Sequence, residues 1–210
     1  EVRMYKKDNK IIADFLLASP DNMVRGFTFV LLSIQQPTQG LADKMLEVDQ
    51  QGLECRHLNY GKTVTKRDGL AYVQANKRAI FERLTHHVSQ GLDDVENISK
   101  ALLFVYNTPN LGMVKSAFVL QLLGFNVSCI DSHNLKRLGW KQSQVSLPKT
   151  LKHESKMRKI RAYVSQTQQK GTAYWWDSWC HYVAGNIANK KLTTGQQVSN
   201  YHIEAILPKA

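Results

Sequence analysis

The turn near residue 110 could bind a phosphate group through its backbone alone. Two apolar stretches flank Pro109-Asn110-Leu111-Gly112, so we expect a tight helix-hairpin-helix over 93–123, with a small residue where a side chain would clash. The second helix would begin with free amides at its positive end, which can hold a phosphate without selecting a sequence. The groups concerned are the amides of Leu111, Gly112, Met113 and Val114, with the charge of Lys115 beside them. An ordinary helical hairpin in a bundle is the alternative.

Two further groups have side chains suited to a nucleic-acid base. Gln35 and Gln36 can each donate and accept hydrogen bonds, which suits a residue that fills the space left by an extruded base; a solvated turn is the alternative. Trp175 and Trp179 are four residues apart and share one face of an expected helix, while Trp176 points elsewhere. Most of these rings are expected in the core, and one turned toward a pocket, such as Trp175, could stack on a base.

The charge of the chain favours a polyanionic partner. Its 28 Lys and Arg residues outnumber 17 Asp and Glu residues, for a formal charge of +11. Neutralising DNA phosphates with Lys and Arg releases condensed counterions, which strengthens binding at low salt. Double-stranded DNA is therefore the expected partner, although charge alone can also serve only solubility. The basic helix over 149–161 could follow a phosphate backbone or form a solvated face.

The cysteines and histidines predict neither a metal site nor a cofactor. Cys55, Cys129 and Cys180 are odd in number and widely spaced, and the pair His86-His87 has no acidic or Cys partner at a fixed offset. Buried thiols of this kind are typical of an intracellular, reducing compartment, such as a bacterial or phage-infected cytoplasm or a nucleus. No run of eighteen apolar residues is present, so we expect no membrane span.

Helical periodicity dominates the chain, and we expect an all-α fold of about nine helices in a single unit over 1–210. The length allows one domain or two packed halves. Ser19-Pro20-Asp21, Asp93-Asp94 and Asp131-Ser132 supply start signals, and glycines mark the ends. The expected helices span 10–18, 21–34, 38–51, 68–89, 93–106, 113–123, 131–138, 148–169 and 172–188.

Four sequence blocks together resemble the helix-hairpin-helix DNA glycosylase superfamily. The stretch from Pro109 to Ala117 is similar to the hairpin of that family, and Ile130-Asp-Ser-His-x-x-x-Arg-Leu-Gly139 is similar to its later Val-Asp-Thr-His-Val-x-Arg motif. Leu31-Leu-Ser-Ile-Gln-Gln-Pro-Thr38 resembles its early Leu-Ser-x-Gln-x-Thr block, and 74–80 resembles its Arg-Asn-Lys-Ala helix. The blocks follow the family order within 31–139, and 172–188 resembles its closing helix. The resemblance implies a fold organised as two packed halves.

The resemblance assigns roles to several side chains. It places the Asp131 carboxylate beside the sugar of a flipped nucleotide, where it can stabilise positive charge at the anomeric carbon or orient a water. A helix N-cap is the alternative role for Asp131, and the two are compatible. The resemblance also implies that Gln35 wedges into the base stack. His133 is a possible substrate contact, with local packing as its alternative.

The chain also departs from the family pattern. Val114 stands where lyase members carry the Schiff-base lysine, and Lys115 is one place away, so a covalent lyase step is not expected. Asn110 replaces the first hairpin glycine, which is tolerable because Asn visits left-handed conformations more readily than most residues. The four cysteines that hold an iron-sulfur cluster in some members are missing, so no cluster is expected.

A monofunctional DNA N-glycosylase is therefore the leading hypothesis. The second is a bacteriophage-type transferase that modifies hydroxymethylated pyrimidines in DNA on the same scaffold. The third is a DNA-binding protein with no chemistry, in which Asp131 only caps a helix.

Overall fold

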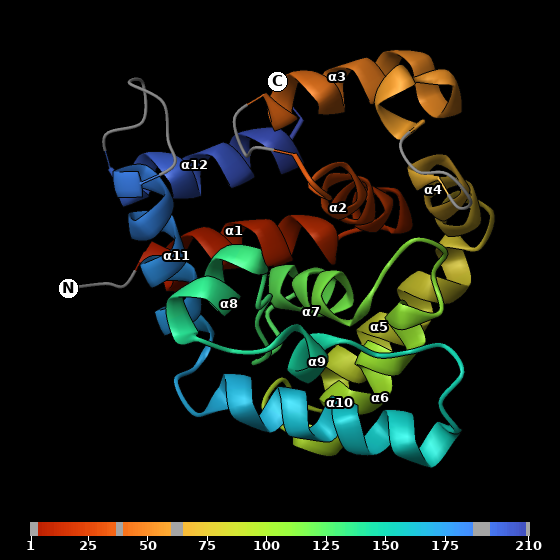
Figure 1. Ribbon diagram of the computed structural model, residues 1–210. Coiled ribbons are helices and arrows are strands. Elements are labelled where there is room, and N and C mark those ends of the chain that lie inside the picture. Colours follow the sequence, from red (N-terminus) through yellow and green to blue (C-terminus); the bar gives the residue numbers. More distant parts are fainter. Residues whose placement is uncertain (1–3, 37–39, 60–64, 187–193, 209–210) are drawn as a thin grey trace.

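The computed structural model describes residues 4–36, 40–59, 65–186 and 194–208. Every element within these residues is helical, and they contain no strand (Figure 1). The expectation of an all-α fold is confirmed. The helices are α1 Met4–Leu16, α2 Pro20–Leu32, α3 Leu41–Gln51, α4 Lys66–Ala75, α5 Lys77–Gln90, α6 Val95–Tyr106, α7 Met113–Leu122, α8 Ser132–Leu138, α9 Gln142–Val145, α10 His153–Gln168, α11 Thr172–Asn186 and α12 Gly195–Ile206, with 3-10 turns at Gly52–Glu54 and Arg56–Leu58.

The expected start signals act as helix caps. The Ser19 side chain accepts a hydrogen bond from the Asn22 amide at the start of α2. Asp94 caps α6 in the same way. Asp131 caps α8. Each cap satisfies an amide that has no partner inside its own helix, so these three predictions are confirmed.

The expected count of about nine helices is wrong, because the described residues form twelve. The helix expected over 68–89 breaks at Asn76, whose side-chain amide donates to the Tyr72 carbonyl and ends α4. The short helix α9 and the whole of α12 were not expected. Helix α12 begins with a capping box between Thr194 and Gln197.

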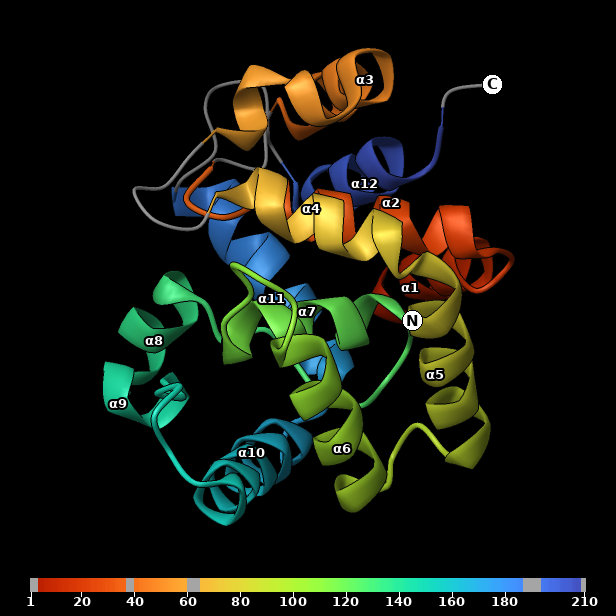
Figure 2. The ribbon, with the colours of Figure 1, turned by 90° about the vertical axis from the view of Figure 1, so that its right-hand side faces the viewer.

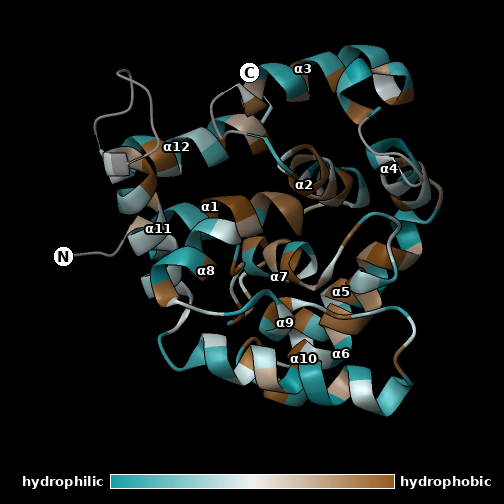
Figure 3. Cartoon of the chain, viewed as in Figure 1, coloured by the Kyte–Doolittle hydropathy of each residue, from teal (hydrophilic) through white to brown (hydrophobic). Residues whose placement is uncertain are grey.

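Helices α2 and α7 form the centre of the molecule. Figure 3 shows both as predominantly hydrophobic, whereas α3 and α10 at the periphery carry many hydrophilic positions. Every residue of α2 from Phe27 to Leu32 is buried. Helix α7 is buried from Ser116 to Leu122. Helices α1, α3, α4, α5 and α12 contact α2, and α6 joins α7 to α10. The end of α2 and the start of α7 are thereby held close together inside the fold.

The hairpin between α6 and α7 depends on a glycine that lies outside it. A Cβ atom added at Gly69 in α4 would lie 2.6 Å from the Pro109 carbonyl oxygen, so only glycine lets α4 approach the turn this closely. Asn110 has a φ of 67°, the left-handed conformation expected for it. The clash expected at Gly112 is wrong: its φ is −87°, and an added Cβ atom would meet nothing within 4 Å.

Among the described helices, none has the length and apolar character needed to cross a membrane. Figure 2 shows α8 and α9 on one side of the molecule and α5 on the opposite side.

Candidate functional site

A cavity of about 600 Å³ lies where α2 ends and α7 begins, and α8, α11 and α12 close it. A cavity of this volume is in the range that accommodates drug-sized ligands. Seven of the residues predicted for the site line it: Gln35, Gln36, Val114, Lys115, Asp131, His133 and Trp175. Four do not: Asn110, Leu111, Gly112 and Met113. The cavity thus gathers three of the sequence blocks and Trp175, together with two tryptophans that were not predicted for it.

Aromatic rings form much of the cavity wall. The ring centroid of His202 lies 4.7 Å from that of Trp176, 5.6 Å from that of Trp179 and 5.6 Å from that of Phe29. Phe118 completes the group, with its centroid 6.3 Å from that of His202. These separations are typical of tilted and edge-to-face pairs, so the rings support one another and present apolar surface to a planar ligand.

The tryptophans of α11 differ from the sequence expectation. Trp176 was expected to point away from Trp175 and Trp179, but all three line the cavity. Trp175 is almost fully buried, and its indole donates to the Thr167 carbonyl at 2.8 Å. Trp175 therefore supports the wall, and Trp176 and Trp179 belong to the aromatic group around His202.

Asp131 acts as the helix cap considered for it, and its side chain also lines the cavity. Its Oδ1 accepts from the Asn134 amide at 2.9 Å and so caps α8. Its Oδ2 accepts from the Trp179 indole at 2.9 Å, while the side chain still lines the cavity. The loop before it is fixed by Tyr163, whose hydroxyl donates to the Ser128 carbonyl and accepts from the Ile130 amide. The carboxylate is consequently held in one orientation.

Two buried side chains offer hydrogen-bonding atoms to the cavity. The amide oxygen of Gln121 accepts from the Cys129 amide, and no described residue bonds the amino group of Gln121. His202 donates from Nδ1 to the Val198 carbonyl at 2.9 Å, which leaves Nε2 as an acceptor. Burial lowers the pKa of His202 to about 4, so the ring is neutral at pH 7. From these two side chains, a ligand in the cavity would meet one donor group and one acceptor.

Lys115 and Val114 both reach the cavity from the first turn of α7. The Lys115 ammonium donates to Ser33 Oγ at 3.0 Å and lies 5.3 Å from the centre of the Phe118 ring. Lys115 thus lines the cavity, and its ammonium has a hydrogen-bond partner in Ser33.

The hairpin amides are free with one exception. The Leu111 amide donates to the Thr108 carbonyl at 3.2 Å, so the expectation of a free amide is wrong at this position. No described residue accepts from the amides of Gly112, Met113 and Val114. The Leu111 and Met113 side chains are buried. Leu111 and Met113 could therefore contact a ligand only through their backbone atoms.

Gln35 and Gln36 form one lip of the cavity. Gln35 is exposed and has a φ of 53°, a left-handed conformation that is uncommon for residues other than glycine and is found at functional sites. The Gln36 side chain accepts a hydrogen bond from Lys44. The last residues of this sequence block, Pro37 and Thr38, lie outside the described residues.

His133 lies on α8 at the cavity, with its ring 6.3 Å from that of Tyr182. Cys129 also lines the cavity, and burial raises the pKa of its thiol to about 12, which makes it a poor nucleophile. In the part of the chain that the structure describes, no cluster of three or more His, Cys, Asp or Glu side chains could hold a metal ion.

Sequence reasoning missed much of the cavity wall. Phe29, Phe118, Gln121 and His202 carry no motif, and they meet only because α2, α7 and α12 pack together. For His202 the available signal was the capping box at Thr194, which could have revealed α12 and its buried face. The chain matches no protein-family model, no curated protein and no solved structure.

Proposed function

We propose that this chain binds duplex DNA, accommodates one flipped-out base in the large cavity and acts as a monofunctional DNA N-glycosylase. The observation that carries the proposal is the convergence of Gln35-Gln36, the start of α7 and Asp131-Ser132-His133 on one cavity. The resemblance to helix-hairpin-helix glycosylases assigns these three stretches to base displacement, phosphate binding and catalysis. Because all three roles act on the same nucleotide, the three stretches must lie around one cavity.

The aromatic wall suits an unstacked base. A base leaving the duplex loses its stacking, and the rings of Trp176, Trp179 and Phe118 can replace part of it. The Gln121 amino group can donate to a ring nitrogen or carbonyl of the base, and His202 Nε2 can accept from one of its N–H groups. Gln35 would fill the space that the base leaves in the duplex.

In the proposed reaction, Asp131 assists cleavage of the base-sugar bond. As the bond breaks, the base leaves with the bonding electrons and positive charge develops at the anomeric carbon. A carboxylate held by Asn134 and Trp179 can stabilise that charge without reorganising. A water oriented by Asp131, the carboxylate that the resemblance places beside the sugar, then adds to the anomeric carbon, and the proton that the water loses goes to the departing base.

The proposal is tested by incubating the protein with a panel of duplexes, each carrying one damaged or modified base, and measuring abasic sites by alkaline strand cleavage. On a duplex that is cleaved, we expect Asp131→Asn to lower the single-turnover rate about a hundredfold or more. Stability should fall by only about 1 kcal/mol, because the amide keeps one oxygen as a cap and loses one hydrogen bond.

Asp94→Asn is the matched control, because Asp94 caps α6 in the same way and does not line the cavity. Its rate should stay within about twofold of wild type. Equal rates for Asp131→Asn and wild type would remove the catalytic assignment. If no duplex in the panel yields abasic sites while base extrusion is detected, the glycosylase reaction is wrong and the binding step stands.

A further inference from the structure

A second cavity of about 150 Å³ adjoins the large one, and Gln36 lines both. Its volume corresponds to about five water molecules and suits a small polar group. Its other lining residues are Leu32, Lys44, Arg56, His57, Asn59 and Lys66. Basic side chains therefore make up most of its polar wall, in contrast to the aromatic wall of its neighbour.

Lys66 lines this small cavity and is almost fully buried. Its ammonium donates to the carbonyls of Leu32 and Ile34, at 3.2 and 2.9 Å, where α2 ends. A cation at a helix C-terminus is favourable, which accounts for the position of Lys66 itself. The helix C-terminus does not account for the other basic residues of the cavity, Lys44, Arg56 and His57.

Lys44 is the group that leaves positive charge uncompensated. Its ammonium donates to the Gln36 side chain, and it forms no ion pair with any described residue. Glu47 contacts Arg56 and His57, at 3.6 and 3.1 Å, and so offsets part of the charge on that side only.

The basic groups are close enough to repel one another. Burial, followed by the charges of Lys44 and Lys115, lowers the pKa of Lys66 to about 8. An anion between them would relieve that repulsion and receive charge-assisted hydrogen bonds, which are roughly twice as strong as neutral ones.

We propose that the small cavity is a subsite for a phosphoryl group, held by Lys44, Lys66 and Arg56. This inference goes beyond the proposed glycosylase activity and does not depend on it. Because Gln36 borders both cavities, a phosphoryl group in the small one and a ring in the large one can belong to a single nucleotide. The phosphoryl group can come from the DNA backbone beside an extruded nucleotide or from a separate small ligand.

The subsite is tested by titrating the whole chain with inorganic phosphate and with pyrophosphate in a calorimeter at low salt. Lys44→Gln and Arg56→Gln should each weaken pyrophosphate binding about tenfold or more. Lys10→Gln is the control, because Lys10 is exposed on α1 and already pairs with Asp14. It should change the affinity less than about twofold. Circular dichroism would establish that all three variants are folded.

Competition with a labelled DNA duplex identifies the source of the phosphoryl group. Displacement of the duplex by pyrophosphate, or weaker duplex binding by Lys44→Gln than by Lys10→Gln, would support a backbone phosphate. Pyrophosphate binding without displacement would support a separate phosphorylated ligand. The proposal is overturned if Lys44→Gln and Arg56→Gln match Lys10→Gln in both the pyrophosphate and the duplex titrations.

Discussion

At the scale of single residues, the cavity combines side chains whose states are set by burial. His202 is neutral because desolvation opposes its protonation, and its Nδ1 hydrogen bond fixes which nitrogen faces the ligand as an acceptor. Asp131 is fixed by two hydrogen bonds. The polar atoms of His202 and Asp131 are thus held in place before any ligand binds. Substitution of His202 should change how stability depends on pH, and substitution of Asp131 should change the reaction rate.

The buried imidazole of His202 should make the fold sensitive to acid. Its folded pKa of about 4 lies below the unfolded value of 6.5, so between these limits the unfolded chain binds the extra proton. The contribution of the neutral His202 to the free energy of unfolding is therefore fully present above pH 6.5 and is lost as the pH falls toward 4. The loss should be on the order of 3 kcal/mol.

Urea titrations of the wild type and His202→Phe at several pH values would check this. Phenylalanine keeps a ring against Trp176 but cannot titrate. Below pH 6.5 the free energy of unfolding of the wild type should therefore fall relative to that of the variant. His87 also has a lowered pKa through burial, but it contributes equally to both proteins. A constant difference from pH 7 to pH 4 would exclude the neutral-imidazole account.

At the scale of the helices, local signals and long-range packing contribute differently. Ser19, Asp94 and Asp131 could be predicted as caps because the cap and its amide lie within three residues of each other. Helix α12 was missed because its buried face includes polar residues, Ser199 and His202, which weaken the apolar periodicity. Gly69 could not be assigned a role, because its constraint comes from a carbonyl in a distant turn.

The candidate site shows the same contrast between local sequence signals and long-range packing. The blocks at 35–36, 114–115 and 131–133 were predicted from their order along the chain. Trp176 was assigned to the wrong face because helical periodicity describes one helix alone, whereas the cavity is wide enough to be lined by two faces of α11. The aromatic wall depends on which helices pack together, which local patterns do not specify.

The hairpin gives a matched pair of substitutions. Gly69→Ser should destabilise the fold by about 1–3 kcal/mol, because the new side chain forces α4 away from the Pro109 carbonyl. Gly112→Ser should leave stability unchanged or slightly higher, because space is open there and Ser is a good N-cap. Thermal unfolding measures both. Equal losses would show that α4 does not restrain the turn.

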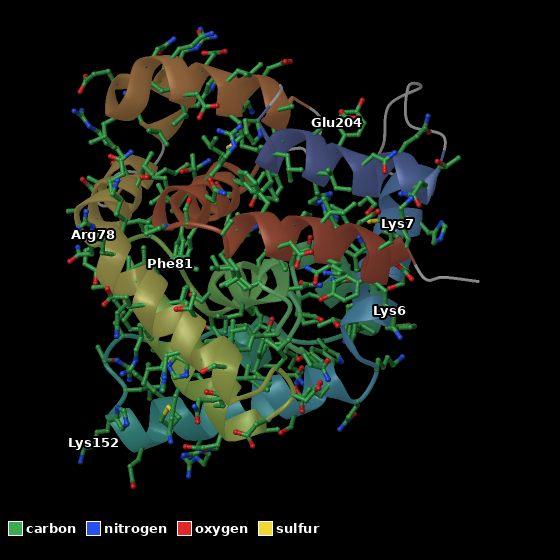
Figure 4. The ribbon with its side chains drawn as sticks, turned by 180° about the vertical axis from the view of Figure 1, so that it is seen from behind. Lys6, Lys7, Arg78, Phe81, Lys152 and Glu204 are labelled. Carbon is green, nitrogen blue, oxygen red and sulfur yellow. The ribbon has the colours of Figure 1, made fainter. Side chains whose placement is uncertain are left out.

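At the scale of the whole molecule, the basic residues are not confined to those that line the two cavities. Figure 4 shows Lys6 and Lys7 on α1 and Arg78 on α5, on the opposite side from the view of Figure 1. Some basic groups are already paired, as Arg161 is with Glu96 at 2.6 Å. In the proposed function, the net charge of +11 attracts DNA without fixing its orientation, and the hairpin and the cavity orient it.

Binding to duplex DNA should therefore depend little on sequence and strongly on salt. With about four or more phosphate contacts, the logarithm of the association constant should fall against the logarithm of salt concentration with a slope of about −4. Fluorescence anisotropy with two unrelated duplexes would measure it. A slope corresponding to one or two contacts would contradict the electrostatic account.

The measurement that tests the central claim most directly is the permanganate reactivity of a thymine opposite the base that the cavity receives. In a duplex labelled on the thymine strand and carrying a mismatch, we predict that the protein raises the reactivity of that one thymine, because its partner has left the stack. Gln35→Ala should bind the duplex with similar affinity and lose most of the increase. Full binding by the wild-type protein with no increase at any thymine would show that no base enters the cavity.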